Sequence, residues 1–181
     1  MNGCSVLLIA LLCPGIAFCQ ERISANATQH LALVKTITIK KFTFSYSIDG
    51  ANLSAKVSFP TRGWVAVGFS PKKRMLGANI IIGSISPEGP DKGIRIDDQY
   101  GIAPTRHKPD AEIGGENNII DGSAIEENGT TTIFFTIPLD SRDSADTPLV
   151  PGTETTVIFA AGKQEDLSAK HSWTAKIKMK L

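Results

Sequence analysis

The chain is poor in cysteine, the residue that cross-links small secreted domains and builds many metal sites. It has only Cys4, Cys13 and Cys19, and all three lie in the first 19 residues. If that segment is removed, no disulfide can form and a cysteine-rich zinc site is excluded. The motif Cys-x-x-Cys-His is absent as well, so covalent attachment of haem in the c-type manner is excluded.

The chain also lacks an excess of positive or negative charge, and it lacks the common hydrolase motifs. Lysine and arginine number 19 against 18 acidic residues, so the overall balance does not suggest a nucleic-acid or membrane-surface partner. There is no Gly-x-Ser-x-Gly elbow, and paired carboxylates in loops are too common to indicate a glycosidase. Several acidic groups could form a calcium site, but the spacing of an EF-hand is absent and we do not expect one. These groups are Asp97, Asp98, Asp110, Glu112, Glu116 and Asp121.

The first 19 residues are uncharged and largely apolar. They contain the run Val6–Leu12, which is too short to span a bilayer, and a break at Pro14-Gly15. This pattern predicts a cleavable signal peptide over residues 1–19 and therefore a secreted or periplasmic protein with no stable membrane span. A polar segment, 20–34, would follow it. An uncleaved anchor and acylation of Cys19 are the alternatives.

Residues 35–181 show short runs of alternating apolar and polar residues, rich in β-branched and aromatic side chains and separated by turns. The length suits one domain, and the pattern predicts an all-β protein, an antiparallel immunoglobulin-like β-sandwich. Asn128-Gly129 predicts a hairpin. The stretch 100–117 has prolines, glycines and no periodicity, so we expect an irregular loop there. The nine expected strands are Thr36–Ile48, Leu53–Phe59, Trp64–Phe69, Ala78–Ile85, Gly93–Asp97, Asn118–Ile125, Thr130–Ile137, Thr155–Ala161 and Ser172–Met179.

Two side chains stand out as candidate ligands. Met75 follows the basic run Lys72-Lys73-Arg74. A methionine more commonly fills a core, but three basic residues next to it are unusual for that role. His171 opens the last strand-like run, where a lone histidine is more often a surface residue. One methionine with one histidine is a pairing used for haem iron, and it also suits copper.

Several short sequence segments, in a fixed order along the chain, resemble those of a known protein family. From about Lys35 to the C-terminus the chain resembles the DOMON family, named for the dopamine β-monooxygenase N-terminal domain. The signatures are Gly63-Trp64-Val65-Ala66-Val67-Gly68-Phe69-Ser70, Arg74-Met75-Leu76-Gly77-Ala78-Asn79-Ile80-Ile81-Ile82-Gly83, Ile119-Ile120-Asp121, Glu126-Glu127-Asn128-Gly129-Thr130-Thr131 and Pro138-Leu139-Asp140-Ser141.

Haem-binding members of this family, which are b-type cytochromes, use a methionine before the strand at 78–85 and a histidine near the C-terminus. Met75 and His171 match these places, so the resemblance implies non-covalent haem b with these two axial ligands. The expected apolar walls are Trp64, Phe69, Ile80, Ile82, Phe159 and Trp173. Two protein ligands leave the iron no free position, which favours electron transfer with a redox partner protein over catalysis.

Other readings of the same residues stay open at this point. Some members of the family lack the two ligands, so a haem-free extracellular binding module for a carbohydrate or other small ligand is the main alternative. A copper or haem carrier is a third. His107 is the reserve histidine ligand, and Lys72-Lys73-Arg74 could neutralise haem propionates or steer an acidic partner.

Overall fold

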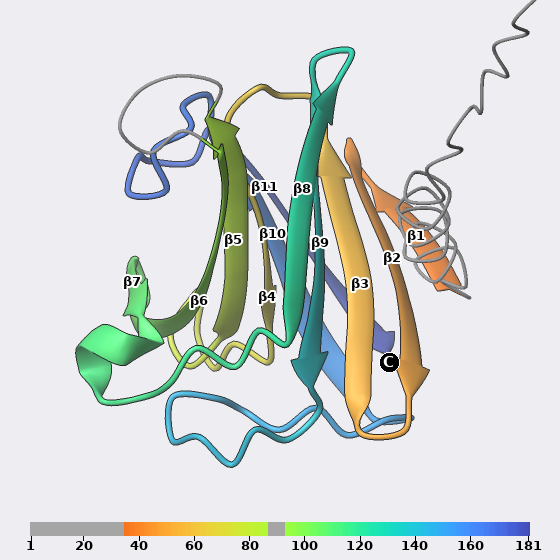
Figure 1. Cartoon of the computed structure of the whole chain (residues 1–181). Coiled ribbons are helices and arrows are strands. Elements are labelled where there is room, and N and C mark those ends of the chain that lie inside the picture. Colours follow the sequence, from red (N-terminus) through yellow and green to blue (C-terminus); the bar gives the residue numbers. More distant parts are fainter. Residues whose placement is uncertain (1–34, 87–92) are drawn as a thin grey trace, which may run out of the picture. The chain divides into compact units, whose positions relative to one another are not determined.

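Two antiparallel sheets pack face to face in a β-sandwich (Figure 1). The computed structural model describes residues 35–86 and 93–181, so the predicted signal peptide and the whole polar segment after it lie outside the described residues. The first sheet has the order β1-β2-β3-β9-β8. Its strands are β1 (Lys35–Ile39), β2 (Phe42–Asp49), β3 (Asn52–Phe59), β8 (Asp121–Glu127) and β9 (Thr130–Pro138).

The second sheet carries the candidate site and has the order β11-β10-β4-β5-β6-β7. Its strands are β4 (Val65–Phe69), β5 (Asn79–Ser86), β6 (Gly93–Ala103), β7 (Arg106–Pro109), β10 (Glu154–Ala161) and β11 (Trp173–Lys180). A single turn of 3-10 helix, η1 (Asp110–Ile113), follows β7. Among the described residues, no helix is long and apolar enough to cross a membrane.

The core between the sheets is built by alternation along the strands. In β3 and β9 every second residue is buried, which places one side of each strand against the opposite sheet. Aromatic rings fill much of this space: Phe42 lies 4.3 Å from Phe59 and 5.6 Å from Phe159 between ring centroids, and Phe44 lies 5.6 Å from Phe159. Burial of these rings therefore contributes to the stability of the sandwich.

The all-β expectation is confirmed, with three differences in detail. The expected first strand is two strands, β1 and β2, because the chain reverses at Lys40, which has a φ of 54°. The strand expected to end at Asp97 continues to Ala103. The stretch 100–117 is not wholly irregular, since it contains β7 and η1. Pairing of β7 with the end of β6 supplies the backbone hydrogen bonds that a sequence pattern does not reveal.

The hairpin expected at Asn128-Gly129 is confirmed. These two residues connect β8 to β9 with φ angles of 51° and 72°, the left-handed conformation that a tight type I′ turn requires. This turn fixes the pairing of Glu127 with Thr130 and therefore the alternation along both strands.

Candidate functional site

The second sheet is apolar on its outer side as well as on the side that faces the core. All of β4 and the first six residues of β5 are buried, so these strands need cover on both faces. We call the side turned away from the first sheet the outer face. Its apolar residues come from the three central strands: Ala66, Ile80, Ile82, Ile158 and Ala160.

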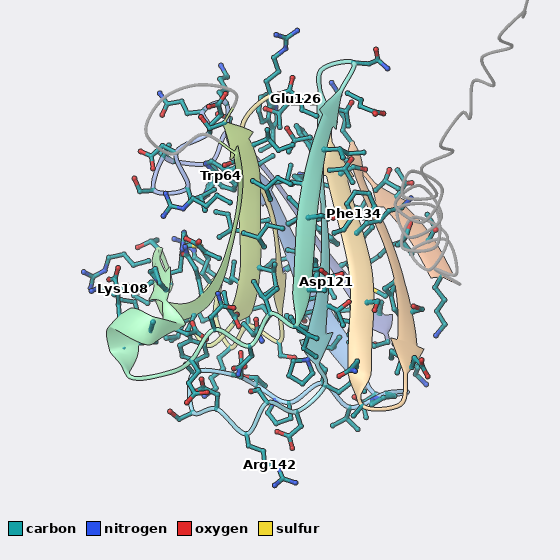
Figure 2. All side chains as sticks on the ribbon, viewed as in Figure 1. Trp64, Lys108, Asp121, Glu126, Phe134 and Arg142 are labelled. Atoms are coloured by element: carbon teal, nitrogen blue, oxygen red, sulfur yellow. The ribbon has the colours of Figure 1, made fainter. Side chains whose placement is uncertain are left out.

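Three side chains from outside these strands cover the outer face. Trp64, Leu167 and Met75 pack with it in a second hydrophobic cluster, separate from the main core. Trp64 and Leu167 are each 3% exposed, whereas Met75 is half-buried. Figure 2 shows Trp64 on the side of β5 that faces away from β8 and β9. An apolar surface covered by a thioether and an indole is therefore present.

The loop 162–172 is fastened to the sheet by its backbone. The Ser84 hydroxyl donates to the carbonyl of Glu165 at 2.8 Å, and the backbone N–H of Trp64 donates to the carbonyl of Gln164 at 3.0 Å. These bonds hold the loop so that Leu167 reaches the outer face. Hydrogen bonds from Ser168 lower the pKa of the exposed Asp166 carboxyl in the same loop.

Met75 lies in a tight loop that connects β4 to β5. The carbonyl of Met75 accepts from the backbone N–H of Ala78 at 3.0 Å, and Gly77 donates to Gly101 at 2.7 Å. A Cβ placed on Gly101 would overlap the Met75 carbonyl, so only glycine permits this close approach of β6 to the loop. The thioether is thus presented by a backbone held at several points, as the sequence suggested for a loop position.

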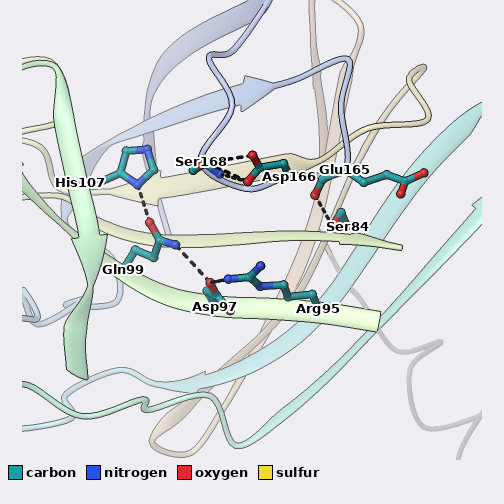
Figure 3. Close-up of polar contacts among 8 residues, drawn as sticks. All are labelled: Ser84, Arg95, Asp97, Gln99, His107, Glu165, Asp166 and Ser168. Atoms are coloured by element: carbon teal, nitrogen blue, oxygen red, sulfur yellow. Dashed lines mark hydrogen bonds and ion pairs between the residues drawn. The ribbon is translucent and has the colours of Figure 1, made fainter. Parts of the chain in front are cut away.

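His107 heads a chain of polar side chains on β6 and β7 (Figure 3). Its Nδ1 contacts Oε1 of Gln99, and Nε2 of Gln99 donates to Asp97 at 3.3 Å. Arg95 donates to the same Asp97 carboxylate at 3.4 Å. Because the Gln99 oxygen can only accept, Nδ1 of His107 carries the proton and Nε2 keeps its lone pair.

Burial lowers the pKa of His107 below its usual range, and the nearby His171 lowers it further. The imidazole is therefore neutral at pH 7. A neutral imidazole with one nitrogen fixed by a hydrogen bond is the form that binds metals. Gln99 was not singled out from the sequence, and Asp97 was considered only as an acidic group for calcium, although their positions two apart on one strand place them on the same side of the sheet.

A pocket of about 420 Å³ lies between β6, β7 and the loop that carries Leu167. Most of its lining residues have polar or charged side chains, and neither Met75 nor His171 is among them. The lining residues are Arg95, Asp97, Gln99, Ile102, Thr105, Arg106, His107, Lys108, Pro109, Glu112, Asp166, Leu167 and Ser168. Leu167 thus belongs both to this pocket and to the apolar cluster on the outer face.

His171 lies near the end of the same loop, two residues before β11. Its side chain is exposed, and it lies close enough to His107 to perturb that residue's pKa. Met75 contacts the cluster that contains Leu167, and His171 follows Leu167 by four positions in the loop. The structure thus places Met75 at the outer cluster, and it places His171 near His107 in the loop that carries Leu167.

The six predicted wall residues divide into two groups. Trp64, Ile80 and Ile82 lie in the outer cluster. Phe69 and Phe159 point the other way, into the core between the sheets, because they alternate with the outward residues Gly68 and Ile158. Trp173 packs its ring 5.0 Å from Phe59 at the sandwich edge. These three aromatic residues therefore do not line the outer face.

Comparison with known proteins agrees with this architecture. The family model of the DOMON domain matches residues 38–162. The chain is an antiparallel β-sandwich of the kind seen in cytochrome b domains, and it belongs to the DOMON family.

Two solved structures illustrate the likeness of fold. The cytochrome b domain of pyranose dehydrogenase from Coprinopsis cinerea is 11% identical, with a TM-score of 0.53; the match covers 77% of this chain and 76% of that one. The cytochrome domain of cellobiose dehydrogenase from Myriococcum thermophilum is 8% identical, with a TM-score of 0.54 and 81% of each chain covered. At these identities the likeness concerns the fold alone.

The residues on the outer face fit a b-type haem in their chemistry. A thioether packs on an apolar surface, and the imidazole of His107 and several cationic side chains lie at the pocket beside it. The buried indole N–H of Trp64 also has no hydrogen-bond partner among the described residues, so this donor could bind an acceptor on a ligand. Leu167 already covers part of the surface, which limits the area against which a flat group can lie.

Proposed function

We propose that this protein is a b-type cytochrome that binds one haem on the outer face of the second sheet and transfers electrons, with Met75 and His171 as axial ligands. The observation that carries the proposal is the position of Met75, whose side chain packs on a second apolar surface outside the core.

The chain's own residues would divide the work in a simple way. Met75 and His171 would hold the iron from the loops that precede β5 and β11, while Ala66, Ile80 and Ile82 would exclude water from one side. Arg106 and Lys108 at the neighbouring pocket could neutralise anionic propionates, as could the Lys72-Lys73-Arg74 run next to Met75. The haem would supply reversible one-electron chemistry, and methionine ligation raises its potential relative to two histidines.

Absorption spectra of protein expressed with haem supplied test the proposal. We expect a Soret band and sharp low-spin bands on reduction in the wild-type protein. Met75→Leu keeps the volume but removes the sulfur, and should change the axial ligation and the reduced spectrum. Met179→Leu is the matched control, because Met179 packs against the main core.

A parallel pair of variants distinguishes the histidines. His171→Gln should abolish the low-spin spectrum, whereas His107→Gln should leave it in place. The reverse result would assign the iron to His107, whose Nε2 is free and whose Nδ1 is held by Gln99. A colourless wild-type protein, or an unchanged spectrum in Met75→Leu, would contradict the proposed ligand pair.

The many hydrogen-bonding side chains around the 420 Å³ pocket favour a second candidate function, a haem-free binding module for a small molecule such as a carbohydrate. Asp97, Gln99 and Asp166 could hydrogen-bond to such a ligand. Its lining residues include no tryptophan, tyrosine or phenylalanine on which a sugar ring could stack, which makes this function the weaker of the two. Calorimetric titration with mono- and oligosaccharides would detect it without any cofactor.

Electron transfer implies a redox partner protein and no catalytic role for this chain. The apolar leader over residues 1–19 supports export, so we propose that transfer takes place outside the cytoplasm, in the periplasm or the extracellular space. Sequencing the N-terminus of the exported protein would show whether cleavage follows Cys19.

A further inference from the structure

Three carboxyl groups from distant parts of the chain meet at the end of the second sheet where β5 begins. Asp98 on β6, Asp110 at the start of η1 and Asp146 in the loop before β10 each present an oxygen within 4.8 Å of the other two. Asp98 and Asp110 are 3% and 1% exposed, and Asp146 is half-buried. Three carboxylates at this separation repel one another strongly unless protons or a cation neutralise them.

The oxygens in this cluster lack the hydrogen bonds that buried acceptors normally have. Both oxygens of Asp110 are without a partner in the described structure, as is Oδ1 of Asp98 and of Asp146. The second oxygen of each of the latter two is used: Asp98 accepts from the backbone N–H of Asn118 at 2.9 Å, and Asp146 accepts from the Ser141 hydroxyl at 2.6 Å. These hydrogen bonds orient the carboxyls and leave one oxygen of each free.

Two asparagines give an independent indication of a ligand at this place. Asn79 is 5% exposed and its amide donates to Asp146, yet its Oδ1 has no partner in the described structure. Asn118, whose backbone binds Asp98, also leaves its Oδ1 without a partner. Leaving a buried amide oxygen unsatisfied is costly, and carboxyl protons can satisfy only some of these acceptors.

The donor set selects the kind of ion. Every available atom is an oxygen, which excludes a preference for zinc or copper, since these favour nitrogen and sulfur. The three carboxyl groups offer four unpartnered oxygens, and two more belong to Asn79 and Asn118, which hydrogen-bond to the cluster. An all-oxygen set suits Ca²⁺, which takes six to eight oxygens in flexible geometry, better than Mg²⁺, which retains several waters. Three carboxylates also exceed the two positive charges of the ion, which favours tight binding.

We infer that Asp98, Asp110 and Asp146, with Asn79 and Asn118 beside them, form a calcium site that fastens η1 and the loop at 139–149 to the second sheet. The site is separate from the apolar outer face, because Asp98 pairs with Ile81, which belongs to the core between the sheets. The ligand set also differs from the acidic residues considered from the sequence: Asp97, Glu112, Glu116 and Asp121 are not in it, and Asp146 is.

Calcium titration of the purified protein after treatment with a chelator tests this inference, with or without haem. We expect calorimetry to give one Ca²⁺ per chain, and the melting temperature to rise with Ca²⁺ concentration, because an ion that binds only the folded state stabilises it. Asp110→Asn should weaken Ca²⁺ binding by about tenfold to a hundredfold or more. Loss of a residue that only supports a metal ligand already has an effect of this size.

Glu127→Gln is the matched control, since it removes one exposed carboxylate on the other sheet and should leave Ca²⁺ binding unchanged. Asp146→Asn is the second test variant, because Asp146 is half-buried and its replacement is less demanding for folding. Circular dichroism confirms that each variant is folded. A wild-type protein with no heat of binding and no change in melting temperature at about 10 mM Ca²⁺, well above the range for weak extracellular sites, would overturn the inference.

Discussion

The metal-free protein should become less stable as the pH rises from 4 to 9, and Asp110→Asn should remove much of that loss. Burial, followed by the charges of Asp98, Asp146 and Asp143, raises the pKa of Asp110 from 3.8 to about 8. Burial is also the largest cause that raises the pKa of Asp98 to about 7. The folded state therefore holds protons that the unfolded chain releases near pH 4.

The sign of the effect follows from this difference. Below pH 4 both states of Asp110 are protonated and the group contributes no pH dependence. Between pH 4 and 8 only the folded state retains the proton, so the free energy of unfolding falls as the pH rises. A rise in pKa of about four pH units, at about 1.36 kcal/mol per unit, lowers the free energy of unfolding by on the order of 5 kcal/mol above pH 8.

Urea denaturation at pH 4 and pH 9 measures this difference directly. Asparagine has nearly the same shape and no charge, so the variant and the wild type should have similar midpoints at pH 4. At pH 9 the variant should be more stable, and with a typical dependence on urea a difference of several kcal/mol moves the midpoint by about 2 M. Glu127→Gln, at an exposed site, should follow the wild type throughout.

Calcium provides a second check on the same reasoning. Bound Ca²⁺ requires ionised carboxylates, so the wild type should lose its decline in stability when Ca²⁺ is added at high pH, and the variant should respond little. Parallel urea midpoints for wild type and Asp110→Asn at both pH values would refute the argument, because they would show that Asp110 titrates in the folded protein as it does in the unfolded chain.

Three further substitutions test other parts of the structure. Gly101→Ala would place a Cβ against the Met75 carbonyl, so the melting temperature should fall and any haem spectrum should change; an unaltered protein would contradict the close approach of loop and strand. Phe135→Ala removes a ring that is 1% exposed and should cost about 3–5 kcal/mol in urea denaturation, a loss below 1 kcal/mol being inconsistent with a packed core. Ser84→Ala should cost about 1 kcal/mol and speed hydrogen exchange around Leu167, and unchanged exchange would show that this bond does not hold the loop.

The local pattern of the sequence was enough to predict most strands, the hairpin at Asn128-Gly129 and the membership of the DOMON family. Alternation in β3 and β9 carries this information because one side of each strand is buried and the other is not. It fails in β4 and β5, where both sides are buried and the sequence gives no contrast between them. The direction in which Phe69 points therefore could not be read from its neighbours.

The sequence by itself thus determined the class of fold, the strand pattern and the two candidate ligands, since these depend on residue order over short distances. Only the tertiary structure decided which aromatic residues enter the core and which lie on the outer face. It alone joined Asp98, Asp110 and Asp146, since β6, the turn η1 and the loop before β10 must assemble before residues so far apart in the chain can meet. The physical reason is that residues adjacent in the sequence determine whether a segment forms a strand. The contacts of a side chain across the fold depend instead on how the whole sheets pack.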